Sequence, residues 1–412
     1  MRRYFRPEYL AIASASVLTV GLSTGKGLLS VCTVALAFSA LWYSVEERKF
    51  RIRAGEQWTM WWMIGLFLVS LMSGIWTEDR DRWLIDVYEK IPLLLIPPAV
   101  ALLPRFSKWE WRWIKFIFLA TQSVVAVWTL IRFTLTYREQ MQRVAENSFI
   151  DIVGSISHIY FGLLLGWSVV IGIHLYRDIQ EEKPAWLKFV IIALTIVNSI
   201  SIHILVSRTG LLAFYAGIIA YGAIMLWQSG RKWLIAGLVG AAVLGPVVAY
   251  YTIPSFQTRV RVTIWDAEQY YYQADLTDNS LSLRFLAWEA TWGIITEHPV
   301  LGTGMEDVGA DMLDQYKKQG LDDRGENLLT NPHNQFLKQW AGAGIPGLLI
   351  LVMAVVQPVW DHRQKFPPLV FAFMMTMAIT MMFESLLERQ IGMTTFAVFG
   401  MWVIANSGQE EP

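Results

Sequence analysis

The residues best suited to chemistry stand together in Asn331-Pro332-His333-Asn334-Gln335, directly before an apolar run. Asn is a favoured N-cap and Pro suits the first helical position, so we expect Asn331 and Pro332 to place His333 in the first turn of a helix. The positive end of the helix dipole disfavours an imidazolium there, so His333 should stay neutral. A neutral imidazole with polar neighbours can accept a proton from a substrate hydroxyl. We therefore predict that His333 acts as a general base, and that Asn334 and Gln335 are further candidates for substrate contact.

Arg208 and Arg284 are the cations that best complement such a base. Arg208 lies in a short polar link between two apolar runs, and Arg284 lies in an amphipathic stretch. A guanidinium group binds phosphate oxygens bidentately and keeps its charge when desolvated. Arginines that converge on His333 would hold a diphosphate leaving group without a metal ion. An arginine at the end of a span can instead extend its charge to the lipid headgroups, so the sequence alone leaves both interpretations open.

Other polar residues near apolar runs have simpler interpretations. Lys90 can pair with its neighbour Glu89, and the residues Glu384 and Glu388 with Arg389 are typical of a charge cluster at a helix end. Four other histidines show no metal-ligand spacing, so no metal site is expected among them: His158, His174, His203 and His362.

The composition indicates an all-α protein that crosses a membrane many times. Hydrophobic residues make up 54% of the 412 positions and gather in runs of about 20, the length that a helix needs to span a bilayer. The net charge is zero and no basic block is present, which argues against a nucleic-acid partner. The single cysteine, Cys32, excludes a disulfide within the chain.

The apolar runs predict about twelve transmembrane helices. Their expected ranges are 9–24, 27–45, 58–76, 85–103, 110–135, 156–176, 185–206, 208–228, 232–252, 336–358, 366–386 and 390–406. Lys and Arg are concentrated in the loops on the side of the N-terminus, so the positive-inside rule places both termini in the cytoplasm. We expect three parts: nine spans in 1–252, one large loop on the far side in 253–335, and three spans with a short tail in 336–412.

The large loop contains two local patterns. Residues 281–296 have apolar positions at helical spacing, which predicts an amphipathic helix on the membrane or on the bundle. The following stretch from His298 to Gly304 contains Pro299 and two glycines, which predicts a break and a turn of the chain.

These motifs resemble those of the bacterial O-antigen ligases, within the superfamily of O-antigen ligases and polymerases. His333-Asn334 followed after nine residues by Gly344-Ile345-Pro346-Gly347 is similar to the His-Asn and Gly-x-x-Gly signature of that family. The loop pattern around Arg284, with the turn at 298–304, is similar as well. The order and sidedness of the motifs carry the resemblance, together with the layout of spans along the whole chain.

The resemblance implies a metal-independent, inverting glycosyltransferase of the GT-C type without a cofactor, in the inner membrane of a Gram-negative bacterium. It would move O-antigen from undecaprenyl diphosphate to a sugar hydroxyl of lipid A-core at the periplasmic face. His333 would be the base, with Arg208 and Arg284 on the diphosphate. Lys90 and Arg82 are weaker candidates for substrate binding, because of their side of the membrane and because 90–95 is similar to a recurrent stretch in ligases. The oligomeric state is left open.

Several other functions remain consistent with the sequence. Within the superfamily, an O-antigen polymerase commonly has two sizeable periplasmic loops, and many protein O-oligosaccharyltransferases carry a C-terminal extension. A metal-dependent route through the carboxylates of Glu78-Asp79-Arg80-Asp81 competes with a simpler interpretation, a solvated ion-pair patch. A secondary transporter also often has twelve spans, but it would need ion-coupling groups near the bilayer midplane and often repeated halves.

Overall fold

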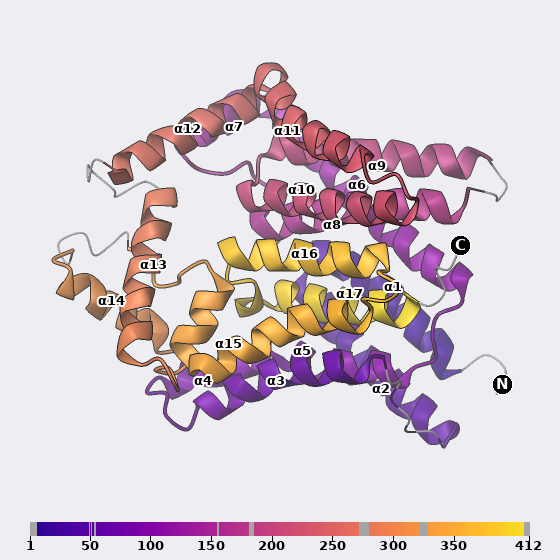
Figure 1. The fold of residues 1–412 in the computed structure, drawn as a ribbon, viewed down its shortest axis with the longest axis horizontal. Coiled ribbons are helices and arrows are strands. Elements are labelled where there is room, and N and C mark those ends of the chain that lie inside the picture. Colours follow the sequence, from indigo (N-terminus) through magenta and orange to yellow (C-terminus); the bar gives the residue numbers. More distant parts are fainter. Residues whose placement is uncertain are drawn as a thin grey trace.

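A computed structural model shows the described residues, 6–48, 50, 52, 55–154, 156–180, 185–271, 280–321 and 328–407, as an assembly of helices without strands (Figure 1). The helices are α1 (Pro7–Thr24), α2 (Lys26–Glu46), α3 (Gln57–Ser73), α4 (Arg80–Glu89), α5 (Ile91–Leu102), α6 (Lys108–Leu135), α7 (Tyr137–Ala145), α8 (His158–Asp178), α9 (Ala185–Leu205), α10 (Arg208–Gln228), α11 (Leu234–Thr252), α12 (Pro254–Tyr271), α13 (Ser280–Glu297), α14 (Val308–Lys318), α15 (Gln335–Asp361), α16 (Pro368–Phe383), the 3-10 turn η2 (Leu386–Glu388) and α17 (Gln390–Asn406).

Seven of the described helices are long and apolar enough to cross a bilayer: α2, α6, α8, α9, α10, α11 and α15. α16 is equally apolar but shorter. The predicted class, an all-α polytopic membrane protein, is confirmed at this level, and twelve crossings stay a prediction.

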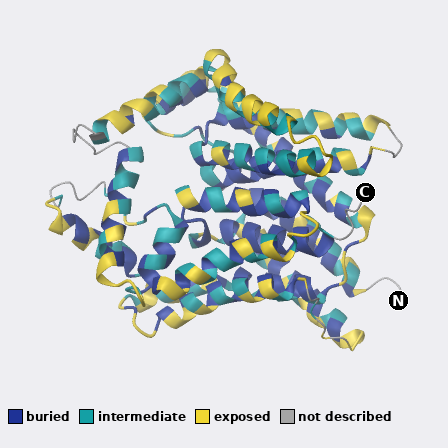
Figure 2. Cartoon of the chain, viewed as in Figure 1, coloured by how far each residue is buried: buried dark blue, intermediate teal, exposed yellow. Residues whose placement is uncertain are grey.

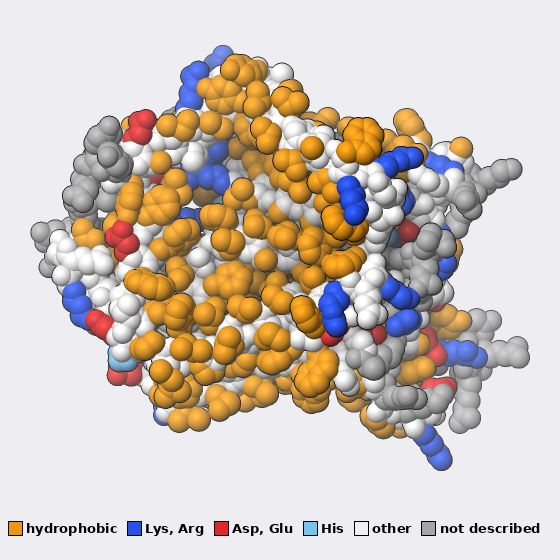
Figure 3. All heavy atoms as spheres, viewed as in Figure 1, with side chains coloured by type: hydrophobic (Ala, Val, Ile, Leu, Met, Phe, Trp, Pro, Cys, Tyr) orange, Lys and Arg blue, Asp and Glu red, His pale blue; other side chains and the backbone are white. Residues whose placement is uncertain are grey.

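The core of the bundle lies around α8 and α17. Every residue from Ile391 to Asn406 in α17 is buried, and 83% of the most apolar stretch of α8 is buried (Figure 2). The rings of Trp167 and Phe373 pack at 5.0 Å between centroids, and Phe399 closes this aromatic group. In contrast, only 22% of the apolar stretch of α9 and 6% of that of α11 is buried, and hydrophobic side chains cover much of the face in Figure 3. These outer faces suit contact with lipid tails.

The chain segment between α11 and α15 folds against one end of the bundle. α1 begins and α17 ends at the opposite end, so the described chain starts and finishes on the same side (Figure 1). Within this segment, α13 and α14 share an apolar core that includes Ala290, Met312 and Tyr316. The segment is therefore a packed unit that can hold side chains in fixed positions.

One predicted span is wrong: the single helix expected at 85–103 is two separate helices. α4 ends at Glu89, Lys90 lies at the junction, and α5 begins at Ile91. Pro92 has no N–H to donate to a carbonyl four residues back, so it suits the first turn of a new helix and not the interior of an old one. The break places the charged Lys90 at the end of the bundle that faces α13 and α14.

Candidate active site

His333 does not lie in the first turn of α15, so that prediction is wrong. The helix begins at Gln335 with Asn334 as its N-cap, whose Oδ1 accepts from the backbone N–H groups of Phe336 and Leu337 at 3.0 and 3.1 Å. His333 has a φ of 47° in the turn before the helix, and its N–H donates to Asn331 Oδ1 at 2.9 Å. Either asparagine could have been the N-cap of α15. Asn334 takes that position, and Asn331 stabilises the turn that contains His333.

The partner of His333 is Glu384, which follows α16. Nδ1 of His333 lies 3.0 Å from Oε2 of Glu384, and the glutamate side chain is only 9% exposed. A carboxylate only accepts hydrogen bonds, so in a neutral His333 the Nδ1 atom would carry the proton and Nε2 would keep the lone pair. A hydrogen bond, and not the helix dipole, thus orients the imidazole as a proton acceptor. Nothing in the sequence pattern singled out Glu384, which reads as part of a charge cluster at a helix end.

Arg284 meets His333 at the same carboxylate. Its Nη2 lies 3.6 Å from Glu384 Oε2, and its Nη1 donates to the carbonyl oxygen of Phe383 at 2.8 Å. Burial lowers the pKa of Arg284 from its usual value, but a guanidinium remains charged at neutral pH. Trp288, one turn further along α13, donates to the carbonyl of Pro332 at 2.8 Å. Through these bonds α13 holds its arginine beside the histidine.

Arg208 is positioned by the start of α10. Ser207 caps that helix, and a Cβ atom at Gly210 would lie 2.6 Å from the Cα of Gly162, so only glycine allows α10 to approach α8 this closely. Nη2 of Arg208 donates to Asn147 Oδ1 at 2.9 Å, and Nη1 lies 3.9 Å from Asp266 Oδ2.

Asp266 links this arginine to α13. The carboxylate is fully buried and accepts from the N–H groups of Leu281 and Ser282, at 2.7 and 3.1 Å, and from the Ser282 hydroxyl at 2.8 Å. A carboxylate at unsatisfied N–H groups of a helix start is a strong cap. Asp266 therefore fixes the end of α13 from which Arg284 projects, a role that its sequence context did not indicate.

The two predicted arginines and the histidine are brought to one region. Arg208 and Arg284 are close enough to repel each other, and His158, at the start of α8, interacts electrostatically with both Arg284 and His333. Arg259 of α12, which the sequence analysis missed, belongs to the same group and repels Arg208. Basic side chains line a recess beneath α12 and beside α13 in Figure 3. The arrangement places a proton acceptor next to positive charge.

The other candidates have bonds of their own. Gln335 is fully buried, and its Oε1 accepts from the Leu387 N–H at 2.7 Å. Lys90 is 2% exposed, and its Nζ lies 2.6 Å from Oδ2 of Asp86. Arg82 is exposed on α4, and its Nε lies 3.4 Å from Asp79. Asn334 is the cap described above. None of these described contacts is with His333.

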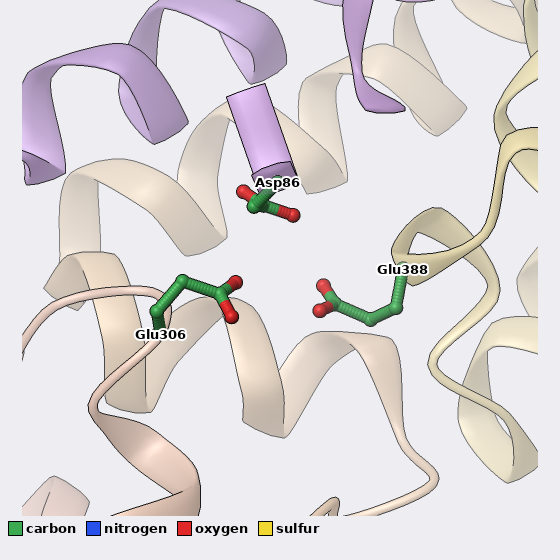
Figure 4. A group of neighbouring side chains, drawn as sticks. All are labelled: Asp86, Glu306 and Glu388. Carbon is green, nitrogen blue, oxygen red and sulfur yellow. The ribbon is translucent and has the colours of Figure 1, made fainter. Parts of the chain in front are cut away.

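Three carboxylates meet beside these residues, near Lys90. The side chains of Asp86, Glu306 and Glu388 point toward one another (Figure 4), and one oxygen from each lies within 4.8 Å of the other two. Two ammonium groups share the space, because Nζ of Lys90 and of Lys338 lie 3.8 and 3.9 Å from Glu388. Lysines that already neutralise the acids fit a buried ion-pair network better than a metal site. The network joins α4, the loop before α14, α15 and η2.

Comparison with known proteins points to the family suggested by the motifs. A protein of Haemophilus influenzae named only "Uncharacterized protein" is 25% identical over 357 residues, which is 85% of this chain and 83% of that protein. The family model described as O-antigen ligase matches residues 193–352, and this segment carries Arg208, Arg284 and His333. The resemblance to the O-antigen ligase family is thereby confirmed over residues 193–352.

Proposed function

We propose that the protein is an O-antigen ligase. It transfers O-antigen polysaccharide from undecaprenyl diphosphate to a sugar hydroxyl of lipid A-core, at the periplasmic face of the inner membrane. The observation that carries the proposal is the joint contact of His333 and Arg284 with Glu384, at 3.0 and 3.6 Å. A base and a phosphate-binding cation fixed to one carboxylate suit attack by a hydroxyl and departure of a diphosphate.

In the proposed reaction the acceptor hydroxyl gives its proton to Nε2 of His333 as its oxygen attacks the anomeric carbon. The bond from that carbon to the diphosphate oxygen breaks, and its electron pair leaves with the diphosphate. Attack from the side opposite the leaving group inverts the anomeric configuration. Glu384 stabilises the imidazolium that forms, as a carboxylate does for a catalytic histidine. Arg208 and Arg284 balance the charge that develops on the leaving group, so no metal ion is required.

The proposed topology has twelve crossings, a GT-C-type arrangement and both termini in the cytoplasm. Under it, α12, α13 and α14 lie on the periplasmic side together with His333. The placement of the site at one end of the bundle, beside exposed apolar helices, supports a donor whose lipid tail stays in the membrane while its diphosphate reaches the arginines.

A polymerase or a protein O-oligosaccharyltransferase of the same superfamily uses the same donor chemistry with another acceptor. The single large excursion between α11 and α15 in the described chain favours the ligase. A transporter is disfavoured, because the charged site lies at the end of the bundle, whereas coupling groups are expected near the midplane.

Transfer by the purified protein tests the proposal. The donor is a glycan on undecaprenyl diphosphate, the acceptor is lipid A-core, and a chelator is present. Formation of lipid A-core that carries the glycan is expected. Elongation of the lipid-linked glycan without transfer to lipid A-core would identify a polymerase, and loss of transfer in chelator with recovery on adding manganese or magnesium would refute the metal-free mechanism.

A further inference from the structure

Arg259 of α12 is a buried cation held by neutral groups. Its residue is 3% exposed. Nη1 donates to Asn147 Oδ1 at 3.2 Å, and Nη2 donates to the carbonyl oxygen of Ser148. The guanidinium carbon also lies 5.1 Å from the ring centroid of Phe149. These contacts fix the orientation of the side chain but supply no negative charge.

The two other arginines of the site each have a carboxylate, and Arg259 has none within 4.0 Å in the described part of the chain. Asp266 lies 3.9 Å from Arg208, and Glu384 lies 3.6 Å from Arg284. Nε of Arg259 is buried without a hydrogen-bond partner among the described residues. Buried charges in proteins are normally paired, since an isolated one is costly. Arg259 therefore lacks a counter-ion among the residues that the structure describes.

The guanidinium of Arg208 lies next to that of Arg259, which increases the positive charge that is not neutralised nearby. Arg208 and Arg259 donate to the same oxygen of Asn147, so their positive groups are adjacent. Burial, and then the charge of Arg208, lower the pKa of Arg259 to about 10, which still leaves it charged at neutral pH. Asp266, the carboxylate 3.9 Å from Arg208, is already bonded to the start of α13. Among the described residues, Arg259 thus lies next to another guanidinium and has no carboxylate within 4.0 Å.

A cavity adjoins the residues that hold Arg259. Ser148 and Phe149 line a cavity of about 320 Å³ together with His158, which also interacts with His333. The cavity therefore adjoins two residues that contact Arg259. A diphosphate carries two charged groups and suits two adjacent guanidinium forks.

We infer that Arg259 is a third arginine of the diphosphate site, and that the diphosphate group of the lipid donor is its missing counter-ion. The identity of the lipid rests on the proposed function, whereas the need for an anion follows from the charge and burial of Arg259. Asn147 positions both Arg208 and Arg259 for the same ligand.

The test measures stability and ligand binding on the full-length protein in lipid nanodiscs. Undecaprenyl diphosphate should raise the Tm of the wild type, while inorganic diphosphate should do so only at much higher concentration. Arg259→Gln should leave the Tm without ligand unchanged or raised, because it removes an unpaired buried charge. The same variant should weaken undecaprenyl diphosphate binding at least tenfold. Arg261→Gln, an exposed arginine on the same helix, is the matched control and should change neither quantity.

A lower Tm without ligand combined with unchanged binding would show that Arg259 is only structural and would overturn the inference. Equal affinity for inorganic and lipid-linked diphosphate would overturn the assignment to a lipid donor. Arg259→Lys keeps the charge but not the fork, and it is the second variant if the glutamine variant does not fold. If Arg259→Lys bound undecaprenyl diphosphate as tightly as the wild type, or more tightly, that result would also contradict the inference.

Binding separates this inference from the proposed ligase activity. A wild type that binds undecaprenyl diphosphate and transfers no glycan would refute the ligase but keep the role of Arg259. A wild type that transfers glycan with Arg259→Gln as fast and with the same donor KM would refute the role of Arg259 alone.

Discussion

Nδ1 of His333 lies 3.0 Å from Oε2 of Glu384, although 51 positions separate the two residues in the chain. The same carboxylate oxygen lies 3.6 Å from Nη2 of Arg284. Glu384 thus connects the proposed base with a proposed diphosphate-binding cation. Movement of α13 or of the turn after α16 would displace both the proposed base and the proposed diphosphate-binding arginine. The position of the segment between α11 and α15 therefore matters for both proposed roles.

His333→Ala should abolish transfer while the protein still folds and inserts. General bases contribute about 10²- to 10⁴-fold to a rate, and alanine at 333 only removes side-chain atoms from a half-buried turn. The measurement is kcat in the purified transfer assay, with Tm to confirm folding. His362→Ala, at the other end of α15, is the control and should retain full activity. Full activity in His333→Ala would exclude His333 as the base.

Glu384→Gln should lower kcat about 10- to 10³-fold with little change in the donor KM, because the amide oxygen still accepts a hydrogen bond but no longer stabilises the imidazolium. Glu297→Gln, which alters an exposed glutamate paired with Lys318, controls for loss of a surface charge. Equal losses of kcat in both variants, or a changed donor KM alone, would contradict the proposed role of Glu384.

Arg208→Lys and Arg284→Lys should each raise the donor KM at least about tenfold, because an ammonium keeps the charge but cannot bind a phosphate with two parallel hydrogen bonds. The acceptor KM should change little. Arg231→Lys, exposed beyond the far end of α10, is the control. Normal donor kinetics in both lysine variants would remove these arginines from the diphosphate site.

Gly344→Ala should destabilise the protein by about 2–4 kcal/mol, the range for backbone strain and overpacking. Gly344 has a φ of 64° at a kink inside α15, and an added Cβ atom would lie 2.0 Å from the carbonyl oxygen of Val300. The turn containing Val300 would have to move away. Gly237→Ala on α11, where no atom lies within 4 Å of the added Cβ, should leave the Tm nearly unchanged.

Glu306→Gln should make the protein more stable than the wild type at pH 8, and this advantage should vanish toward pH 4.5. Burial, against the opposing charge of Lys338, raises the pKa of Glu306 to about 7, from the usual value of 4.5 in the unfolded chain. The folded wild type therefore binds the proton more tightly, and its stability falls as pH rises from 4.5 to 7. We expect a difference of about 1–2 kcal/mol at pH 8 after solvent screening.

The Tm of both proteins, measured between pH 4.5 and 8, checks this. Groups remote from Glu306 titrate equally in both proteins, so their contributions cancel in the difference between the two Tm values. A difference that is constant with pH, or one that grows on acidification, would contradict the assigned pKa shift.

The sequence by itself determined the class of the protein and the members of its signature. Apolar runs long enough to span a membrane, and motifs such as Gly344-Ile345-Pro346-Gly347, are local properties of the chain. They can therefore be recognised without knowledge of the fold. They were enough to propose Arg208, Arg284 and His333 as site residues and to point to the family whose model matches residues 193–352. Local capping rules were not enough at 331–334, because two asparagines compete for the cap and only the surrounding contacts choose between them.

The tertiary structure decided which groups surround these residues. Glu384 meets His333 across 51 positions, and Arg259 shares Asn147 with Arg208 across 112 and 61 positions. Charged residues at the ends of apolar helices look alike in a sequence. Their partners depend on how α8, α10, α12 and α16 pack, and that packing is set by close contacts such as the one between Gly162 and Gly210. For this reason His333 could be singled out from the chain, whereas its contact with Glu384 and the position of Arg259 beside Arg208 could not.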